Sequence, residues 1–173
     1  MFLQSEHIYL RALEPDDLEF LYSLENNPDI WQVSNTTTPY AKHVLQQYLE
    51  QAAADIFSVK QLRLLIHTHQ HQAVGAIDLF DFEPLHQRAG LGIVIAPTYR
   101  QQHYATEALQ LLLKYCREHL LLHQVFCSVS SKNVSSLRLF EKAEFSVVGT
   151  RQQWIRTAAG WQDIVEFQKI LSE

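Results

Sequence analysis

The sequence has little of several residue types that mark specialised classes of protein. Its 173 residues include two cysteines, five glycines and five prolines, with no repeat, low-complexity tract or linker. Cys116 and Cys127 stand in neither a paired nor a metal-type spacing, which disfavours a disulfide framework, a metal site and a catalytic thiol. They are better read as small buried hydrophobes, and so few cysteines favour a reducing cytoplasm.

Long apolar runs and an excess of basic charge are also missing. No segment reaches the roughly 18 apolar residues that a membrane span requires, and the N-terminus has no basic-then-apolar signal pattern. The 14 Lys and Arg against 19 Asp and Glu give a net charge of −5. This balance argues against nucleic acid or an anionic membrane as the main partner, and it suits a cationic amine substrate.

What the chain does contain is typical of an ordinary globular protein. Hydrophobic residues make up 47% and charged residues 19%. The length is sufficient for one domain with a real core, so we expect a single domain over residues 1–173.

Segments with a strand-like hydrophobic pattern are interspersed along the chain with segments that have a helix-like pattern. Apolar alternation predicts strands near 7–13, 62–67, 73–80, 87–96, 124–129, 145–155 and 162–171. Helical spacing predicts helices near 15–26, 40–54, 104–119 and 133–142, with a loop carrying Asn26 to Pro28 and Asn35 to Pro39. The order indicates an α/β (α+β) protein with a central mixed sheet.

Residues 91–113 form the most informative segment. An apolar strand stops at Pro97, which cannot donate a ladder hydrogen bond, and a helix with a clear apolar face starts at Tyr104. The start of such a helix presents unpaired amides and a positive dipole end. It therefore predicts a seat for a phosphate-bearing ligand.

Three motifs in register resemble those of the GCN5-related N-acetyltransferases (GNAT). Residues 100–105, RQQHYA, are similar to the pyrophosphate loop of that family, and residues 133–145, NVSSLRLFEKAEF, to its second cofactor segment. The opening IYLRALEPDDL at residues 8–18 is similar to its first strand and helix start. Asn26-Asn27 and the ending Gly160 to Asp163 are closest to the spermidine and ribosomal-protein-alanine acetyltransferases.

The resemblance implies a fold and a cosubstrate. It implies a six- to seven-stranded, mostly antiparallel sheet with about four helices, in which the fourth and fifth strands splay apart around acetyl-CoA. The residues that it assigns to the cofactor are Ile93, Val94, Ile95, Arg100, Gln101, Gln102, His103, Tyr104, Ala105, Thr106, Asn133, Phe140 and Lys142.

The implied activity is transfer of an acetyl group to a primary amine, such as that of the polyamine spermidine. Two alternatives stay open: acetylation of a protein N-terminus, and a CoA-binding regulatory domain with weak turnover. Dimers are common among proteins of this kind, so a homo-oligomer and a monomer both stay open. The resemblance also implies direct attack of the amine on the thioester, with a backbone N–H near Val94 steadying the oxyanion.

This chain departs from the family pattern at three positions. His103 replaces a loop glycine, and Phe140 stands where a tyrosine usually protonates the thiolate. Gly90 stands where relatives often carry a glutamate that acts as the general base. As substitutes the sequence offers Tyr99 and Tyr104 for the acid, and carboxylates after the third strand, above all Glu83, for the base. Asp78, Asp81, Glu25 and Asp29 are further carboxylates that could attract an ammonium.

One other feature suggests a metal. His67, His69 and His71 alternate along an extended segment, a geometry that could hold a metal ion. They stand at a predicted hairpin tip without a nearby Cys or acidic ligand, so a solvated turn is the preferred interpretation and no metal is expected.

Overall fold

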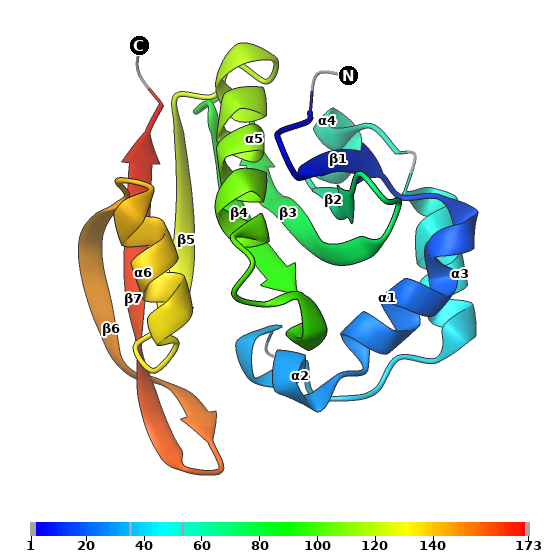
Figure 1. The fold of residues 1–173 in the computed structure, drawn as a ribbon. Coiled ribbons are helices and arrows are strands. Elements are labelled where there is room, and N and C mark those ends of the chain that lie inside the picture. Colours follow the sequence, from blue (N-terminus) through cyan, green and yellow to red (C-terminus); the bar gives the residue numbers. More distant parts are fainter. Residues whose placement is uncertain (1–2, 35, 53, 172–173) are drawn as a thin grey trace.

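The computed structural model describes residues 3–34, 36–52 and 54–171, so the predictions for Asn35 and Ala53 fall outside the described residues. One seven-stranded sheet runs through it in the order β1-β2-β3-β4-β5-β7-β6 (Figure 1). Its strands are β1 (Ile8–Ala12), β2 (Leu62–Thr68), β3 (Ala73–Glu83), β4 (Arg88–Ile95), β5 (Gln124–Ser130), β6 (Ser146–Thr157) and β7 (Gly160–Ile170). All neighbouring strands are antiparallel except β4 and β5. The predicted mixed, mostly antiparallel sheet is confirmed.

The described chain has six α-helices, two more than the pattern predicted. The four expected helices are α1 (Leu18–Glu25), α3 (Lys42–Gln51), α5 (Tyr104–Glu118) and α6 (Val134–Lys142). The additional ones are α2 (Pro28–Ser34) and the single turn α4 (Ile56–Val59). Both are too short for a helical period, and the Asn-Pro signal before α2 indicates a loop as well as a helix start.

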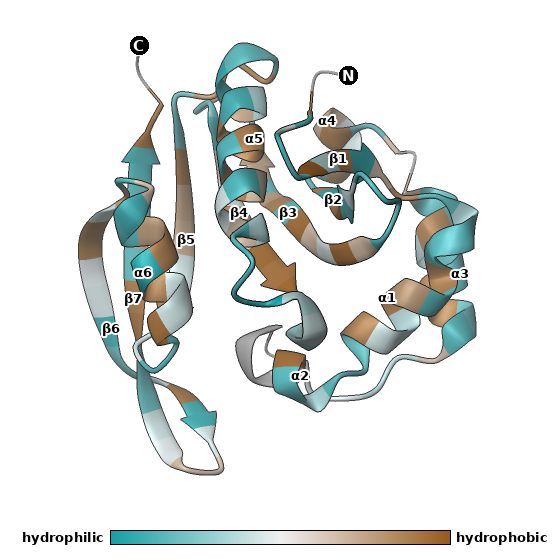
Figure 2. Ribbon diagram, viewed as in Figure 1, coloured by the Kyte–Doolittle hydropathy of each residue, from teal (hydrophilic) through white to brown (hydrophobic). Residues whose placement is uncertain are grey.

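Helices cover both faces of the sheet because side chains alternate along each strand. The larger core packs α5 and Phe140 of α6 against apolar residues of six strands, β1 to β5 and β7. On the opposite face, α1, α2 and α3 bury a smaller cluster against β2 and β3. Figure 2 shows the apolar and polar stripes of α5 that this packing requires. Among the described residues, no helix is both long and apolar enough to span a membrane.

The sheet divides between its two parallel strands. β4 pairs with β5 at only three positions, Arg88 with Gln124, Ala89 with Val125 and Gly90 with Phe126. Beyond Gly90 the strands separate, whereas β5 stays paired with β7 up to Ser130 (Figure 1). The predicted splay between the fourth and fifth strands is therefore present, and it leaves an unpaired edge on each strand.

Candidate active site

A cavity of about 630 Å³ occupies the splay. It is lined on one side by Leu91, Gly92 and Ile93 of β4, and on the other by residues 127–130 of β5. Its lining also includes residues of α6, β6 and β7. Side chains of residues 127–130 point alternately to the two faces of the sheet, so the cavity is lined from both faces.

The backbone of β4 presents alternate groups to this cavity. Ala96 donates its amide to the Val74 carbonyl at 2.9 Å, and the antiparallel register with β3 continues without a shift from Ile95 to Gly90. Alternation along such a ladder directs the backbone groups of Val94 toward β3, and those of Ile93 and Ile95 toward the splay. The Arg100 side chain donates to the Ile95 carbonyl at 3.3 Å, which agrees with this direction. The sequence assigned the oxyanion donor to the neighbourhood of Val94, but the ladder favours the Ile93 amide.

The loop before α5 presents a run of unpaired amides. Within the described chain, residues 101–105 donate no backbone hydrogen bond, and the first donation is from Thr106 to the His103 carbonyl at 3.0 Å. Gln101 and His103 both adopt left-handed backbone conformations, with φ of 62° and 64°. Alternating right- and left-handed residues direct successive amides inward and form a concave anion site.

His103 adopts the left-handed backbone conformation that suits the glycine of the family pattern. Its side chain is exposed and forms no hydrogen bond that caps α5.

A carboxylate in the first turn of α5 accepts hydrogen bonds from the N-terminal segment. Glu107 accepts hydrogen bonds from the Ser5 hydroxyl, at 2.5 Å, and from the backbone and ring of His7, at 3.2 and 2.8 Å. Burial alone would raise the pKa of Glu107, but these hydrogen bonds hold that pKa below its usual value. The donors offset a negative charge that would otherwise weaken anion binding at this helix start.

Helix α6 contributes two side chains that the sequence singled out and one that it missed. The Asn133 side-chain oxygen caps the helix by accepting from the Ser136 amide at 3.2 Å, and Asn133 also lines the cavity. Phe140 lines the cavity too, and its ring packs on Phe145 and Phe167. Ser136, one turn before Phe140, adds a hydroxyl to the lining.

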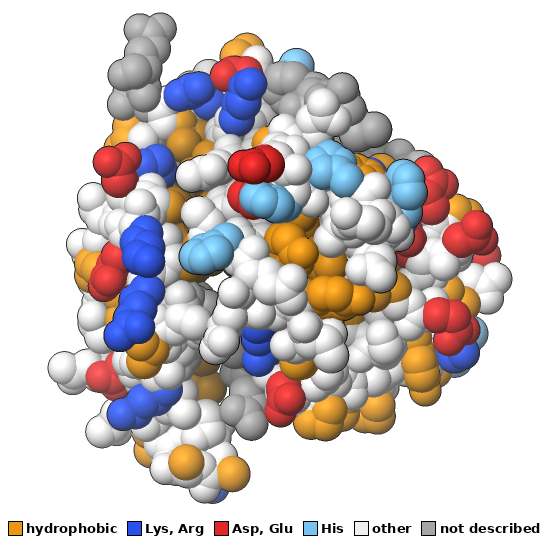
Figure 3. Space-filling model, in the orientation of Figure 1, with side chains coloured by type: hydrophobic (Ala, Val, Ile, Leu, Met, Phe, Trp, Pro, Cys, Tyr) orange, Lys and Arg blue, Asp and Glu red, His pale blue; other side chains and the backbone are white. Residues whose placement is uncertain are grey.

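Lys142 lies in the last turn of α6, outside the described cavity lining. Figure 3 shows basic side chains gathered along α6 on this face of the molecule. They form a positive surface beside the splay.

The position of the missing glutamate is occupied by an aromatic ring. A Cβ on Gly90 would lie 2.2 Å from the Phe80 ring, so that ring already fills the space beside Gly90. Phe80 in turn meets Phe126 edge to face, with ring centroids 6.2 Å apart. A side chain at position 90 would therefore require the partly exposed Phe80 ring to move.

The carboxylate that does line the splay cavity is Glu166 of β7. It accepts a hydrogen bond from the Ser128 hydroxyl at 2.6 Å and pairs with Arg151 of β6 at 2.9 Å. Phe126 is the last residue of β5 that pairs with β4, so Ser128 lies two residues into the splay. Sequence reasoning missed Glu166 because only the β5–β7 register brings it beside Ser128.

The carboxylates that the sequence proposed lie elsewhere. Glu83 pairs in register with Arg88, at the closed end of β4, and with Asp81 it lines a neighbouring cavity of about 770 Å³, which shares Arg151 and Glu166 with the splay cavity. Asp78 is opposite Gly92 and binds Arg63, which also pairs with Glu25. Burial alone would lower the pKa of Arg63, but the two carboxylates raise it. Neither Asp78 nor Glu25 is a free base.

The substitute acids and thiols are also placed by the structure. Tyr99 and Tyr104 pack against the main core and do not belong to the described cavity lining. Cys127 lines the cavity, but burial raises the pKa of its thiol to about 12, as it does for Cys116. Both thiols stay protonated and are poor nucleophiles.

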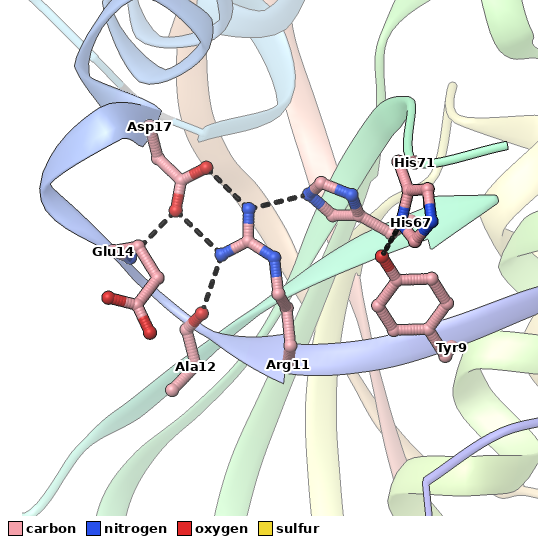
Figure 4. Close-up of polar contacts among 7 residues, drawn as sticks. All are labelled: Tyr9, Arg11, Ala12, Glu14, Asp17, His67 and His71. Atoms are coloured by element: carbon pink, nitrogen blue, oxygen red, sulfur yellow. Dashed lines mark hydrogen bonds and ion pairs between the residues drawn. The ribbon is translucent and has the colours of Figure 1, made fainter. Parts of the chain in front are cut away.

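The three histidines of the β2–β3 hairpin bind different partners, and Figure 4 shows two of them, His67 and His71. The His67 ring accepts from Arg11 at 2.9 Å, and Arg11 pairs with Asp17 at 2.6 Å. His71 contacts the Tyr9 hydroxyl at 3.0 Å, and the His69 ring contacts the Ser5 carbonyl at 3.0 Å. His67 is buried, so the interpretation of a solvated turn is wrong for this residue. Among the described residues, no group of three His, Cys, Asp or Glu could hold a metal ion.

Comparisons with known proteins agree with this geometry. Residues 7–146 match the family described as acetyltransferase (GNAT) domain. Spermidine N(1)-acetyltransferase of Vibrio cholerae is 25% identical over 160 residues, 92% of this chain and 91% of the relative. The Escherichia coli K12 enzyme of the same name is 27% identical over 142 residues, 82% and 74% of the two chains.

Solved structures share the fold. The crystal structure of spermidine N-acetyltransferase from Vibrio cholerae in complex with CoA and spermine superposes with a TM-score of 0.87, at 23% identity, over 95% of each chain. A dodecameric structure of that enzyme gives a TM-score of 0.79 at 23% identity, over 95% of this chain and 94% of the other. At this identity the superposition establishes the fold alone.

Proposed function

Because the chain belongs to the GNAT acetyltransferase family, we propose that it transfers the acetyl group of acetyl-CoA to the primary amine of a small molecule. The observation that carries the proposal is the cavity through the splayed sheet, which has an unpaired backbone edge on one side and a carboxylate on the other. GNAT acetyltransferases use acetyl-CoA, so the test is whether these residues fit that molecule.

The residues of the splay fit a pantetheine chain and a diphosphate. The backbone groups of Ile93 and Ile95 can pair with the pantetheine amides, as a neighbouring strand would. The amides of Gln101 to Ala105 form the anion site at the start of α5, where the helix dipole favours a diphosphate. Asn133 offers its side-chain amide group from the opposite wall.

Bound acetyl-CoA would supply the acetyl group as a thioester, whose C–S bond breaks as the amine forms a C–N bond. The chain's own groups would do three things. Glu166 would hold the acceptor ammonium and take its proton, directly or through water. The Ile93 amide would donate to the carbonyl oxygen as negative charge develops there. Ser136 would donate to the departing sulfur in place of the tyrosine that Phe140 replaces.

Spermidine is the reference acceptor because the relatives at about 25% identity are spermidine acetyltransferases. The cavity that holds Asp81, Glu83 and Glu166 adjoins the splay and offers three carboxylates, together with Lys60, Arg88 and Arg151. A protein N-terminus is the alternative acceptor, and an open face of the sheet at the splay leaves room for it.

The comparison with a dodecameric neighbour also supports self-association. β6 is an edge strand that exposes Val147, Val148 and Trp154, and apolar edge surface of this kind is commonly covered by another chain. We propose a homo-oligomer, which size-exclusion chromatography with light scattering would test. A monomer at all concentrations would refute it.

Calorimetry with acetyl-CoA tests the core of the proposal. We expect saturable binding with one site per chain, followed by thiol release when an amine is added. Mass spectrometry after incubation with spermidine, and separately with an alanine-ended peptide, then assigns the acceptor. Absence of acetyl-CoA binding at millimolar concentration would overturn the enzyme assignment, whereas binding without any acetylated product would indicate a CoA-binding regulatory domain.

A further inference from the structure

A second cavity continues outward from the splay. It has a volume of about 730 Å³ and lies between Trp31 of α2 and the end of the β6–β7 hairpin. Ser130, Asn133, Ile155 and Arg156 line both this outer cavity and the splay cavity. Because the two share these walls, one molecule can extend from the reacting centre into the outer cavity.

The outer cavity is cationic. Its charged lining residues are Lys132 and Arg156, and its described lining contains no Asp or Glu. Neither cation forms an ion pair with a carboxylate of the described chain. This local excess of positive charge occurs in a chain whose net charge is −5.

Two polar neighbours of these cations can also donate. Thr37 has a hydroxyl and Asn133 a side-chain amide, and both residues line the same space. The Ser130 hydroxyl lies there too, but its hydrogen is donated to Gln162 at 2.6 Å. A guanidinium, an ammonium, a hydroxyl and an amide around one space are groups that bind a carboxylate or phosphate.

This cavity differs from the proposed diphosphate site, because none of residues 100–105 belongs to its lining. Asn133, which we also assign to the cofactor, lies where the outer cavity and the splay cavity meet. It also differs from the cavity beside Glu83, in which three carboxylates balance three cations. A polyamine extended into the outer cavity would bring further positive charges toward Lys132 and Arg156, which is unfavourable.

We propose that the acceptor is a primary amine that also carries an anionic group, and that Arg156 and Lys132 bind that group in the outer cavity. The amine lies at Glu166 and the carboxylate or phosphate lies between the α2 side and the hairpin. The inference rests on the proposed acetyltransferase function and narrows its acceptor class from amines in general to amines with an acidic end.

A matched pair of acceptors tests the proposal. Putrescine and γ-aminobutyrate have the same four-carbon chain, and they differ in whether the far end is an ammonium or a carboxylate. With the wild-type chain we expect kcat/KM for γ-aminobutyrate to exceed that for putrescine by about 10-fold or more, the ratio given by one charge-assisted contact. A second experiment uses peptides that begin with alanine and have Asp or Lys at the second position. It shows whether the anionic group belongs to a small acidic amine or to an acidic peptide.

Variants then assign the effect to the two cations. Arg156→Gln and Lys132→Gln should each raise KM for the acidic acceptor about 10-fold, with kcat and acetyl-CoA affinity nearly unchanged. Arg156→Glu should reverse the preference toward putrescine. Arg117→Gln, an exposed change in the last turn of α5, is the matched control and should alter none of these values.

The outcomes separate the two proposals. Efficient acetylation of putrescine and spermidine with little turnover of acidic amines, or unchanged discrimination in the Arg156 variants, would refute the anionic acceptor while leaving the acetyltransferase intact. If instead Arg156→Gln weakens acetyl-CoA binding in calorimetry, the cations serve a cofactor phosphate and the inference is wrong. Failure of acetyl-CoA to bind the wild-type chain would refute the underlying function.

Discussion

At the scale of single residues, the site replaces side chains of the family pattern with others from different strands. The Phe80 ring occupies the space that a side chain at Gly90 would need. Glu166 supplies a carboxylate from the other side of the splay, held by Ser128 and Arg151. The acid-base chemistry is thus proposed to move from β4 to β7, which a motif search on one strand cannot detect.

Glu166→Gln should lower kcat by about 10- to 100-fold, because the amide can neither take a proton nor attract the ammonium by charge. Steady-state kinetics with the same acceptor and the same acetyl-CoA concentration is the measurement. Glu144→Gln, which changes an exposed carboxylate just after α6, is the control. An unchanged kcat would show that Glu166 only orders β5 and β6.

Phe140→Tyr should raise kcat up to about 10-fold, since the ring lines the cavity and a hydroxyl there could protonate the sulfur. Phe145→Tyr is the matched control, because that ring is buried beside Phe140 but outside the described cavity lining. Steady-state kinetics and urea unfolding would distinguish faster chemistry from a change in stability. If turnover does not change, another donor such as Ser136 already serves.

His67 makes folding stability depend on pH. Burial, with the nearby Arg11 charge, lowers the pKa of His67 to about 4 from a usual 6.5. Below pH 6.5 His67 binds a proton in the unfolded chain but stays neutral in the folded chain. The free energy of unfolding therefore falls as the pH drops from 6.5 toward 4, by at most about 3 kcal/mol. Above pH 6.5 this residue has no effect on the dependence.

His67→Gln keeps an acceptor for Arg11 and cannot titrate, so it should flatten the dependence between pH 6.5 and 4. Urea unfolding across this range is the measurement. Asp17 and Glu107 have lowered pKa values, so their contribution to stability is lost as the pH falls below about 5, which overlaps only the acidic end of this range. Equal slopes in variant and wild type would contradict the assignment to His67.

At the scale of elements, the loop into α5 shows how a side chain can occupy a position that favours glycine. His103 adopts φ of 64° as the residue before the helix, and Gln101 adopts 62°. Each L residue in this conformation costs roughly 1 kcal/mol. The loop accepts that cost and keeps its amides aimed at one point, so its shape is retained although its sequence departs from the family pattern.

His103→Gly should relieve this strain, raise the free energy of unfolding by up to about 1 kcal/mol and allow closer approach of a diphosphate. We therefore expect tighter acetyl-CoA binding in calorimetry. Glu144→Gly changes another exposed residue with φ of 62° and should affect stability alone. Weaker binding of acetyl-CoA by His103→Gly would instead show that the imidazole contacts the phosphate.

At the scale of the whole molecule, the two sides of the sheet meet through few hydrogen bonds and one shared core. Only three residue pairs join β4 to β5, while α5 and the main core cross the division. A ligand wedged in the splay would therefore bind both sides at once. We propose that the chain folds as one cooperative domain, which follows from this continuous core.

Acetyl-CoA at about 100 times its Kd should raise the free energy of unfolding by roughly 2.7 kcal/mol, because it binds only the folded chain. Hydrogen exchange should slow in both β4 and β5, with denaturation remaining a single transition. Pantetheine, which lacks the diphosphate and the nucleotide, serves as the comparison and should slow hydrogen exchange less. Protection of one strand only, or two separate transitions, would contradict a wedge between the halves of one domain.

The sequence by itself determined the strand and helix order, the splayed-sheet family and the loop before α5, because hydrophobic period and short motifs are local properties. Residues 91–113 alone predict a buried strand, a turn and an anion-binding helix start. Helices α2 and α4 were not predicted, because a helix of one or two turns is too short to show a hydrophobic period.

Tertiary structure alone decided which groups share the site. Strand register brought Glu166 to Ser128 and carried Glu83 to the closed end of β4. The alternation of hydrogen bonds between β3 and β4 directs the backbone groups of Val94 toward β3 and those of Ile93 toward the splay. The Phe80 ring occupies the space beside Gly90, and the β6–β7 hairpin places Arg156 on the lining of the same cavity as Lys132. These relations join residues far apart in the chain, and no local pattern encodes them.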